Sequence, residues 1–320
     1  MPTDEMGMTS RECADSSCSP GSFKVKFGTG VTGEQEEAYC PYCRRAGDPG
    51  EFMTKDQHRY CNEIVAAEVR EGVSRMMRKA LRLGPTGKKK IGGGLLSMEI
   101  SMKTDRRPPP RRPWEEQLRR DVTCPHCTLE HAVYGLAVWC PDCAKDIFVT
   151  HIKTEAQVIR AMLNDVERRS SELGPRVAAR DIENGLEDVV SILEAAMKAL
   201  ARRKLVTNGA LLEHIGQTFR KQVRNRFQSF DGCVEVFSQL FDLDLAQALE
   251  ADAVSRFKHT LEKRHPITHN LGIVDRKYLE TVRTGEAEGR DVNLDEDEVI
   301  TALDTTVSLI NHAHAELFPS

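Results

Sequence analysis

Residues 124–143 read CPHCTLEHAVYGLAVWCPDC, in which two Cys-x2-Cys pairs flank twelve residues of mostly strand-forming sequence. Thiolates are preferred ligands of zinc, and two such pairs supply the four sulfur atoms of one tetrahedral site. Four sulfur ligands leave no position open for water, so such a site is structural rather than catalytic. The stretch therefore predicts a β-hairpin held by one zinc ion, with the ligands Cys124, Cys127, Cys140 and Cys143.

The spacing of these cysteines resembles that of the zinc-ribbon family. Ala144 departs from the pattern, because such turns often place glycine directly after the second pair. The departure weakens the turn geometry slightly and leaves all four ligands in place.

A second set of four cysteines lies near the start of the chain. Its first pair has four intervening residues and its second pair is Cys-Pro-Tyr-Cys. Between the pairs, residues 23–28 alternate apolar and polar side chains, which is the period of a half-buried strand. A segment this short cannot build a sufficient core, and tetrahedral thiolates replace one. We therefore predict a first zinc ribbon, and two structural Zn²⁺ sites in all; its ligands are Cys13, Cys18, Cys40 and Cys43.

Another ligand set remains open for this first site. Cys40 and Cys43 could be joined by His58 and Cys61, which lie about one helical turn apart on the next element. We prefer to interpret Cys61 as a buried thiol on a helix.

Length and composition indicate a folded chain of several units. Its 320 residues suffice for two or three compact units, and 40% hydrophobic residues is ordinary for a globular protein. We see no charged-then-apolar leader and no apolar run near the ~20 residues that span a bilayer. Closely spaced cysteine pairs are typical of metal binding in a reducing compartment. We therefore expect a cytoplasmic protein without a membrane partner.

Charge is distributed unevenly along the chain. The formal net charge is −4, but residues 75–120 carry fourteen Lys and Arg against four acidic residues, a net of +10. Within this block, residues 106–114 read RRPPPRRPW, and consecutive prolines favour an extended polyproline helix. A stiff basic connector suits RNA or another polyanion, with Trp114 available to stack. A solvated linker explains the same segment equally well.

Between the two predicted ribbons, the pattern indicates one helix and one strand. Thr54-Lys-Asp-Gln57 is a capping box and predicts a helix to about residue 83. Residues 84–94 indicate a loop, and alternation over 96–102 predicts a strand. We expect the apolar residues of the helix to pack inside the protein; they are Tyr60, Ile64, Val73, Met76, Met77 and Leu81.

The second half of the chain is helical by pattern almost throughout. A capping box at Thr154-Glu-Ala-Gln157 predicts a helix to about residue 173, and Asn208 is the expected N-cap of a later one. Cys233 is expected to be a buried, inert thiol. Further helical segments are predicted over 177–204, 227–249 and about 295–317. Amphipathic helices joined by short turns imply an antiparallel bundle, so the predicted fold class is α+β, with small β zinc ribbons followed by an all-α bundle.

Residues 264–270 read RHPITHN and interrupt this helical pattern. The apolar stripe of the preceding helix continues to Arg264, so Arg264 should point inward or into a partner. Pro266 cannot extend an incoming helix but is well tolerated in a first turn. We therefore expect the helix to break at His265 and to restart at Pro266, which would turn His269 back toward Arg264.

A histidine beside an arginine suits cleavage of RNA without a metal. The histidine titrates near neutrality and takes the proton of a ribose 2′-hydroxyl, while the arginine fork binds phosphate oxygens in pairs. Arg264, the polar His265, three further residues and then His269 resemble the Arg-x4-6-His signature of HEPN domains (higher eukaryote and prokaryote nucleotide-binding). These domains are small helical bundles that often act as ribonucleases, and the resemblance covers roughly residues 177–318.

The resemblance implies a site and a reaction. His269 would act as the base, Arg264 would stabilise the phosphorane, and His265 would be the polar auxiliary, with a 2′,3′-cyclic phosphate as the product. In HEPN ribonucleases the site is typically composite across a homodimer, which implies an inactive monomer. We therefore expect a metal-independent endoribonuclease whose ribbons recognise RNA, another nucleic acid or a partner. Its assignment to a defence or toxin system rests on family analogy alone.

The competing interpretation is a non-catalytic adaptor whose bundle mediates dimerisation. In this case His269 caps a helix, and Arg264 pairs with Glu262 or Asp275 to hold the turn.

The expected organisation runs through six segments. They are a first zinc ribbon (1–53), a helix and strand (54–104), a basic Pro-rich connector (105–120), a second zinc ribbon (121–150), a linking helix (151–176) and a HEPN-like bundle (177–320).

Overall fold

The computed structural model describes residues 3–31, 36–83, 88–92, 98–102, 120–282 and 285–319. The basic stretch 106–114 lies outside these residues. The chain divides into two compact units. The first comprises Met1–Thr123, Cys127–Tyr134 and Pro141–Ala144, and the second comprises Cys124–His126, Gly135–Cys140 and Lys145–Ser320.

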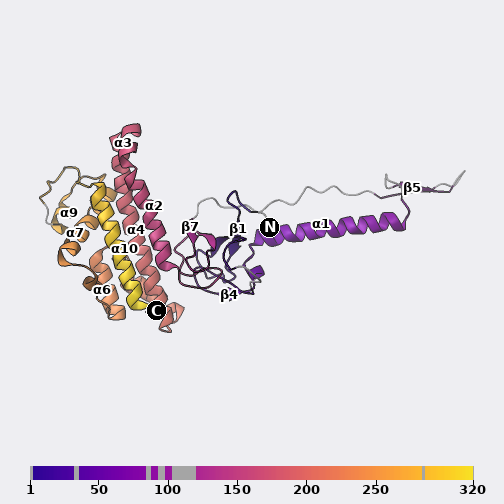
Figure 1. Ribbon diagram of the computed structural model, residues 1–320, viewed down its shortest axis with the longest axis horizontal. Helices are drawn as coiled ribbons and strands as arrows, with labels where there is room; N and C mark the ends of the chain where they lie inside the picture. The colour runs from indigo at the N-terminus through magenta and orange to yellow at the C-terminus, as the bar shows by residue number, and fades with distance from the viewer. Residues whose placement is uncertain are drawn as a thin grey trace. The chain divides into compact units, whose positions relative to one another are not determined.

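A four-stranded antiparallel sheet organises the first unit (Figure 1). Its strands are arranged in the order β1-β2-β8-β7, so that strands from both cysteine-rich segments share one sheet. Their bounds are Met8–Glu12 (β1), Ser22–Lys26 (β2), Arg120–Thr123 (β7) and Glu130–Val133 (β8).

The central strand β2 is the strand predicted from alternation, but both of its faces are covered. Phe23 is 2% exposed and packs edge-on against Phe52 of a short 3-10 turn, Pro49–Phe52 (η1). Lys24 on the other face is fully buried, and its ammonium lies 3.0 Å from the carboxylate of Asp4. A buried ammonium is tolerated only with such a partner, so the pairing explains how a lysine enters the interior of this unit.

Helix α1 (Lys55–Ala80) begins at the predicted capping box. The N–H of Gln57 donates to the hydroxyl of Thr54, and the N–H of Thr54 donates to the side-chain oxygen of Gln57. The amide of Gln57 also donates to the backbone oxygen of Ser10 at 2.8 Å, which fixes the first turn against β1. Gln57 is the one buried residue of α1.

The expectation that the apolar residues of α1 pack inside the protein is wrong. Ile64, Val73, Met76, Met77 and Leu81 are between 37% and 72% exposed. A local pattern gives the direction of an apolar face but not whether another element covers it.

The segment after α1 also differs from its prediction. Strand β5 (Lys88–Ile91) lies inside the predicted loop 84–94 and pairs antiparallel with β6 (Met98–Ser101). The alternation over 96–102 did predict β6. Two further short strands, Ala38–Tyr39 (β3) and Ala46–Gly47 (β4), flank the second cysteine pair of the first set.

The second unit is almost entirely helical, and its long helices lie side by side (Figure 1). The three longest run over Phe148–Asn164 (α2), Pro175–Thr207 (α4) and Glu296–Leu317 (α10), and a shorter helix covers Ala251–Glu262 (α7). The other helices are Val166–Leu173 (α3), Leu212–Thr218 (α5), Phe230–Phe241 (α6), Arg264–Asn270 (α8) and Arg276–Thr281 (α9). Single turns complete the set at Phe219–Val223 (η2), Arg226–Gln228 (η3) and Leu245–Ala248 (η4).

Helix α4 forms the centre of this unit. Its apolar face is buried against α2 and α10, and Gly185 allows close packing on α2, because a Cβ there would lie 2.9 Å from the side chain of Leu163. The core that these three helices share includes Ile152, Leu163, Leu186, Val189, Leu193, Met197, Leu200, Leu303 and Ile310. Cys233 is fully buried, as predicted, and burial raises the pKa of its thiol.

Three predicted helix boundaries in this unit are wrong. Helix α2 begins at Phe148, so Thr154 lies inside it and its hydroxyl bonds to the oxygen of Thr150. Asn208 is the C-cap of α4 rather than an N-cap. The segment 227–249 is a helix flanked by two 3-10 turns. By contrast, the final helix begins as predicted, with the Asp295 carboxylate accepting the N–H of Glu298 at 2.8 Å.

Candidate functional site

The structure brings together both predicted sets of four cysteines. In each set, the four sulfur atoms lie within 4.8 Å of one another. One set is Cys13, Cys18, Cys40 and Cys43, and the other is Cys124, Cys127, Cys140 and Cys143. The four sulfur atoms of each set fit the tetrahedral coordination of one metal ion.

The cysteine pairs lie in tight turns whose backbone aims both sulfurs to one side. The N–H of Cys40 donates to the oxygen of Arg45, and the N–H of Cys140 donates to the oxygen of Lys145, both at 2.9 Å. The residue after the pair takes a left-handed conformation, with φ of 63° at Arg44 and 55° at Ala144. Ala144 therefore adopts the backbone for which glycine is favoured, and the departure noted in the sequence costs some strain without displacing a ligand.

The thiols of the first set shift the pKa values of one another. Hydrogen bonding from the Cys40 thiol is the largest cause that lowers the pKa of Cys43, to about 5. Burial, followed by repulsion from the Cys43 thiolate, raises the pKa of Cys18 to about 12. Four thiols this close together form a ready-made cation site, because a metal ion would stabilise all four as thiolates.

His58 and Cys61 do not belong to this group. Both lie on α1, and neither is among the four grouped ligands. Cys61 is half-buried on α1, so its interpretation as a buried thiol is also wrong.

An ion cluster that the sequence did not suggest lies just after the second cysteine set. The Asp146 carboxylate accepts bonds from the guanidinium of Arg203, from Nε2 of His314 at 3.1 Å and from the N–H of Phe148 at 2.9 Å. Arg203 lies between two aromatic rings, and its guanidinium carbon is 3.8 Å from the ring centre of Phe318. These residues are far apart in sequence, so no local spacing could have revealed them.

The electrostatics of this cluster favour the ionised carboxylate. Burial raises the pKa of Asp146, but the hydrogen bonds from His314, the Phe148 N–H and Arg203 outweigh that effect and lower its pKa to about 2. The cluster ties the start of α2 to the ends of α4 and α10 by charge as well as by packing.

The predicted catalytic residues share one short helix, α8. The helix break comes earlier than expected, at Lys263, so that Arg264 and His265 lie inside the first turn of α8 together with Pro266. Pro266 is tolerated there because the first turn of a helix needs no N–H donor. The helix ends at Asn270, and its C-cap residue Leu271 has a φ of 55°.

Arg264 does not pair with Glu262 or Asp275, the two neighbours considered from the sequence. Its Nε donates to the carboxylate of Glu187 on α4 at 2.9 Å, and its Nη1 donates to Gln228 at 3.3 Å. The hydroxyl of Thr268, one turn further along α8, donates to the same carboxylate. Glu187 therefore anchors α8 to α4, and only the tertiary structure reveals it.

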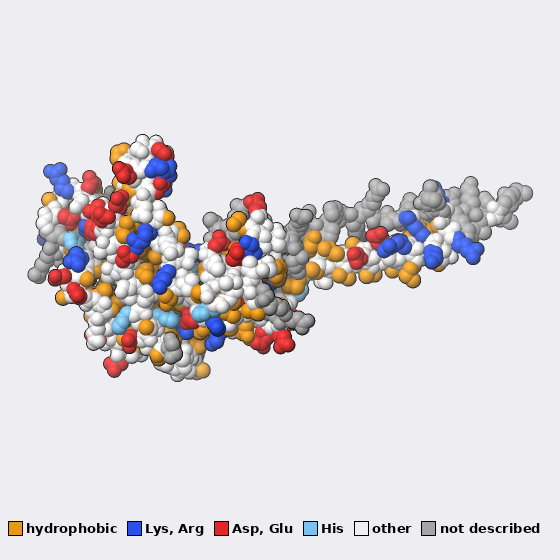
Figure 2. Space-filling model, in the orientation of Figure 1, with side chains coloured by type: hydrophobic (Ala, Val, Ile, Leu, Met, Phe, Trp, Pro, Cys, Tyr) orange, Lys and Arg blue, Asp and Glu red, His pale blue; other side chains and the backbone are white. Residues whose placement is uncertain are grey.

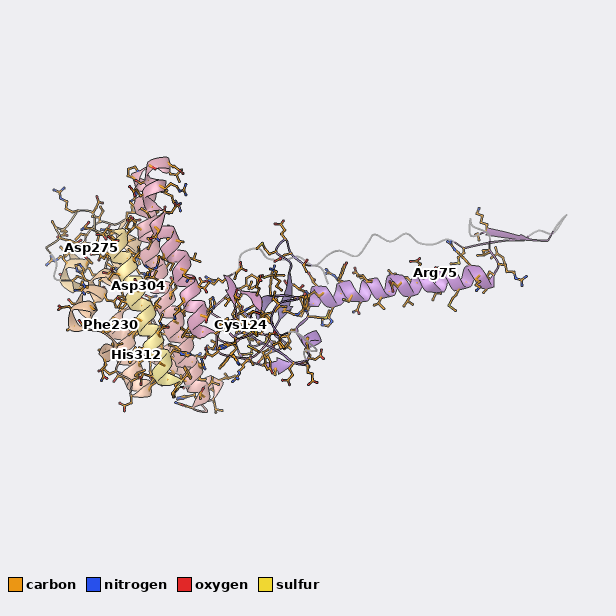
Figure 3. The ribbon with its side chains drawn as sticks, in the orientation of Figure 1. Arg75, Cys124, Phe230, Asp275, Asp304 and His312 are labelled. Atoms are coloured by element: carbon orange, nitrogen blue, oxygen red, sulfur yellow. The ribbon has the colours of Figure 1, made fainter. Side chains whose placement is uncertain are left out.

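The two histidines of α8 lie next to each other near the surface. The ring centres of His265 and His269 are 5.0 Å apart, at an interplanar angle of 55°. Nε2 of His265 also lies 3.7 Å from the carboxylate of Asp275, the N-cap of α9. Figure 3 labels Asp275. The side chain of His265 is 26% exposed and His269 is an exposed residue, so solvent and solutes reach both rings.

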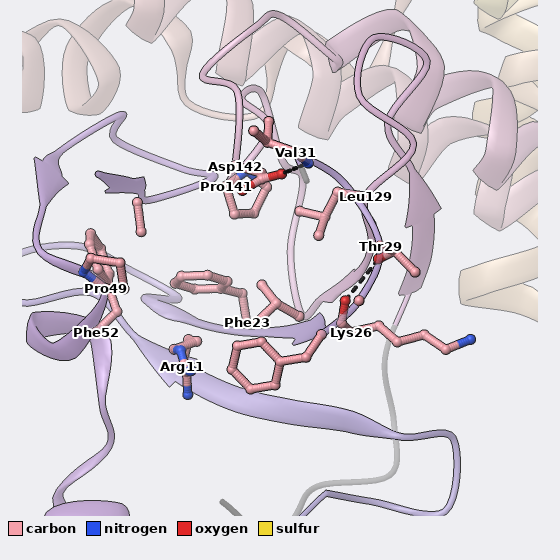
Figure 4. Close-up of a pocket in the computed structure, with 14 residues that line it drawn as sticks. Arg11, Phe23, Lys26, Thr29, Val31, Pro49, Phe52, Leu129, Pro141 and Asp142 are labelled. Atoms are coloured by element: carbon pink, nitrogen blue, oxygen red, sulfur yellow. Dashed lines mark hydrogen bonds between the residues drawn. The ribbon is translucent and has the colours of Figure 1, made fainter. Parts of the chain in front are cut away.

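The first unit contains a cavity of about 400 Å³ (Figure 4). Its walls are largely apolar and include Phe23, Phe52 and Leu129. The charged groups at its edge already have partners: Nη1 of Arg11 donates to the backbone oxygen of Ser10, Lys26 pairs with Glu130, and the Asp142 carboxylate accepts the N–H of Val31. The cavity therefore lacks the convergent polar groups that a catalytic site requires.

None of the helices in the described ranges combines the length and the apolarity that crossing a membrane requires.

Comparison with known proteins finds no relative of this chain. No protein-family model, curated protein or solved structure matches the chain, so the candidate site stands on its own residues and distances.

Proposed function

We propose that this protein is a metal-independent endoribonuclease of HEPN type, with its active site on α8. The observation that supports this most is the grouping of Arg264, His265 and His269 on one short exposed helix, with two imidazole rings 5.0 Å apart. Two adjacent histidines beside an arginine supply a base, an acid and a phosphate ligand without a metal.

The cleavage step assigns one role to each side chain. His269 in its neutral form takes the proton of the ribose 2′-hydroxyl, and the 2′-oxygen attacks the adjacent phosphorus. His265, whose Nε2 lies 3.7 Å from the carboxylate of Asp275, gives a proton to the departing 5′-oxygen. The remaining face of the Arg264 guanidinium binds the phosphorane oxygens, and the product carries a 2′,3′-cyclic phosphate.

Both four-cysteine groups hold zinc in this proposal. Closed four-sulfur sites suit Zn²⁺ in a structural role, so the ribbons shape a surface for nucleic acid or for a partner and take no part in cleavage. By analogy with HEPN ribonucleases, two copies of α8 form the working site in a homodimer.

The test is cleavage of a mixed RNA pool by the purified full-length chain in the presence of EDTA, with product ends mapped. We expect cyclic phosphate ends from the wild type and at least about a hundredfold slower cutting by His269→Ala, because general base catalysis contributes this much. His214→Ala removes another exposed histidine, on α5, and should cut like the wild type. Equal rates for all three proteins would contradict the proposal.

A non-catalytic adaptor is the second candidate, and the contact between Arg264 and Glu187 favours it. This ion pair is 27% and 33% exposed, a setting in which arginine also serves to hold two helices together. If Arg264→Gln and Glu187→Gln lower the unfolding temperature equally and neither changes RNA cleavage, the site on α8 is structural and the adaptor is the better description.

A further inference from the structure

Helix α1 carries an exposed apolar stripe that nothing in the first unit covers in the described residues. The stripe comprises Val65, Val69, Gly72, Val73, Met76 and Ala80, which fall within an arc of about 100° at about 100° per residue. Val65 is 60% exposed, Val69 is 59% exposed and Met76 is 72% exposed. In Figure 2, hydrophobic side chains continue along the outside of α1, and Lys and Arg side chains gather toward its C-terminal end.

The stripe is symmetric about its centre. Reversing the helix about a point between Gly72 and Val73 exchanges Val69 with Met76 and Val65 with Ala80. An apolar face with this symmetry matches itself when a second copy lies antiparallel to it, which is the geometry of a two-fold interface.

Gly72 lies at this centre, and the chain itself gives no reason for a glycine there. A Cβ built at Gly72 meets no atom within 4 Å. Glycine weakens a helix interior relative to alanine, so its presence in the middle of an exposed helix calls for a close approach from outside. Two antiparallel copies of α1 would approach most closely at this point, where Gly72 of one copy faces Val73 of the other.

Charge decides the orientation of the pair. Glu68, Arg75 and Lys79 lie along one edge of the stripe, and Figure 3 shows Arg75 projecting from α1. In the antiparallel register, Glu68 of each copy lies between Arg75 and Lys79 of the other. In a parallel pair, the basic last turns of the two helices would instead lie side by side and repel each other.

We propose that α1 is a dimerisation helix that pairs antiparallel with α1 of a second copy of this chain, centred on Gly72. The interface is distinct from α8 and does not depend on whether α8 is catalytic. It gives the protein a route to bring two copies together through the first unit.

The first test compares two glutamates placed on opposite faces of the same helix. Val69→Glu puts a charge in the stripe, whereas Ala67→Glu puts the same charge on the opposite, exposed face of α1. Sedimentation equilibrium of the full-length, zinc-loaded chain should show association at least about tenfold weaker for Val69→Glu than for the wild type, and unchanged for Ala67→Glu. Circular dichroism checks that both variants keep their helix content. Equal association of the two variants would overturn the proposal, whether or not the bundle also dimerises.

The second test determines whether the two copies of α1 pair in the antiparallel orientation. Glu68→Lys places three cations together in a self-pair, and Arg75→Glu/Lys79→Glu places three anions together, so each variant alone should associate at least about tenfold more weakly than the wild type. Mixed in equal amounts, the two variants are complementary at both contacts along this edge and should form a heterodimer with nearly wild-type affinity. If the mixture associates no better than its components, α1 does not pair in this register.

Discussion

At the scale of single residues, the second unit depends on polar contacts between distant parts of the chain. Glu187 on α4 binds both Arg264 and Thr268 of α8, and Asp146 gathers Arg203 and His314 beside the start of α2. The donors around Asp146 stabilise its carboxylate as the anion, which makes the stability of the fold depend on the ionisation of Asp146.

Asp146 should make folding sensitive to acid. Its pKa in the folded chain is lowered to about 2 from its usual value of 3.8, so its contribution is complete above about pH 4 and is lost as the pH falls toward 2. The shift corresponds to about 2 kcal/mol. Between pH 5 and pH 2, the free energy of unfolding of the wild type should therefore fall by about this amount more than that of Asp146→Asn.

The measurement is urea unfolding of the metal-free wild type and variants across this pH range. Asp304→Asn is the matched control, because Asp304 is a 60% exposed carboxylate of α10 that pairs with Arg160. It should follow the wild-type curve closely. A parallel loss in wild type and Asp146→Asn would show that Asp146 is not the responsible group.

At the scale of elements, the Cys-x2-Cys pairs of both sets lie in the same kind of turn. Each Cys-x2-Cys turn ends in a residue with a left-handed backbone, and the strands next to the two sets join in one sheet. So short a sheet buries little apolar surface, and metal ligation is the stabilising contribution that such small elements ordinarily need.

Metal analysis of single-cysteine variants assigns the ligands. Purified wild type should contain about two zinc per chain, and Cys40→Ser about one, because removal of one thiolate opens a four-sulfur site. Cys61→Ser should retain about two, since Cys61 lies outside both groups. A loss of zinc from Cys61→Ser would instead support the alternative ligand set with His58.

At the scale of the whole molecule, the basic block of residues 75–120 differs in net charge from the rest of the chain. Residues 75–120 carry a net charge of +10 in a protein whose total is −4. A concentrated basic segment attracts polyanions by releasing their counterions, and the strength of that effect depends on salt.

If the basic connector contacts RNA as proposed, the affinity for RNA should weaken steeply as salt rises. Replacing Arg106, Arg107, Arg111 and Arg112 with glutamine should reduce the slope of log K against log salt by about 3, the value for four contacts to a single strand. The control replaces four well-exposed arginines of the helical unit, Arg168, Arg176, Arg180 and Arg276, and should leave the slope unchanged. The measurement is a fluorescence titration of single-stranded RNA at several salt concentrations. An equal change in both variants would mean that overall charge, rather than the connector, sets the affinity.

The sequence by itself determined the features that depend on neighbours along the chain. Cysteine spacing identified both four-sulfur groups, alternation identified β2 and β6, and the capping box at Thr54 marked the true start of α1. The helical pattern from about residue 295 likewise located α10. These predictions are confirmed because ligand turns, strand periodicity and helix caps are set by contacts within a few residues.

Only the tertiary structure decided the features that depend on distant partners. The capping box at Thr154 is overridden because α2 extends back to Phe148, which is buried in the core. The apolar residues of α1 lie exposed because no other described element of the first unit covers them, and Arg264 pairs with Glu187, 77 residues away. Packing and ion pairing between distant segments follow from how the elements assemble, and a local sequence pattern carries no record of that assembly.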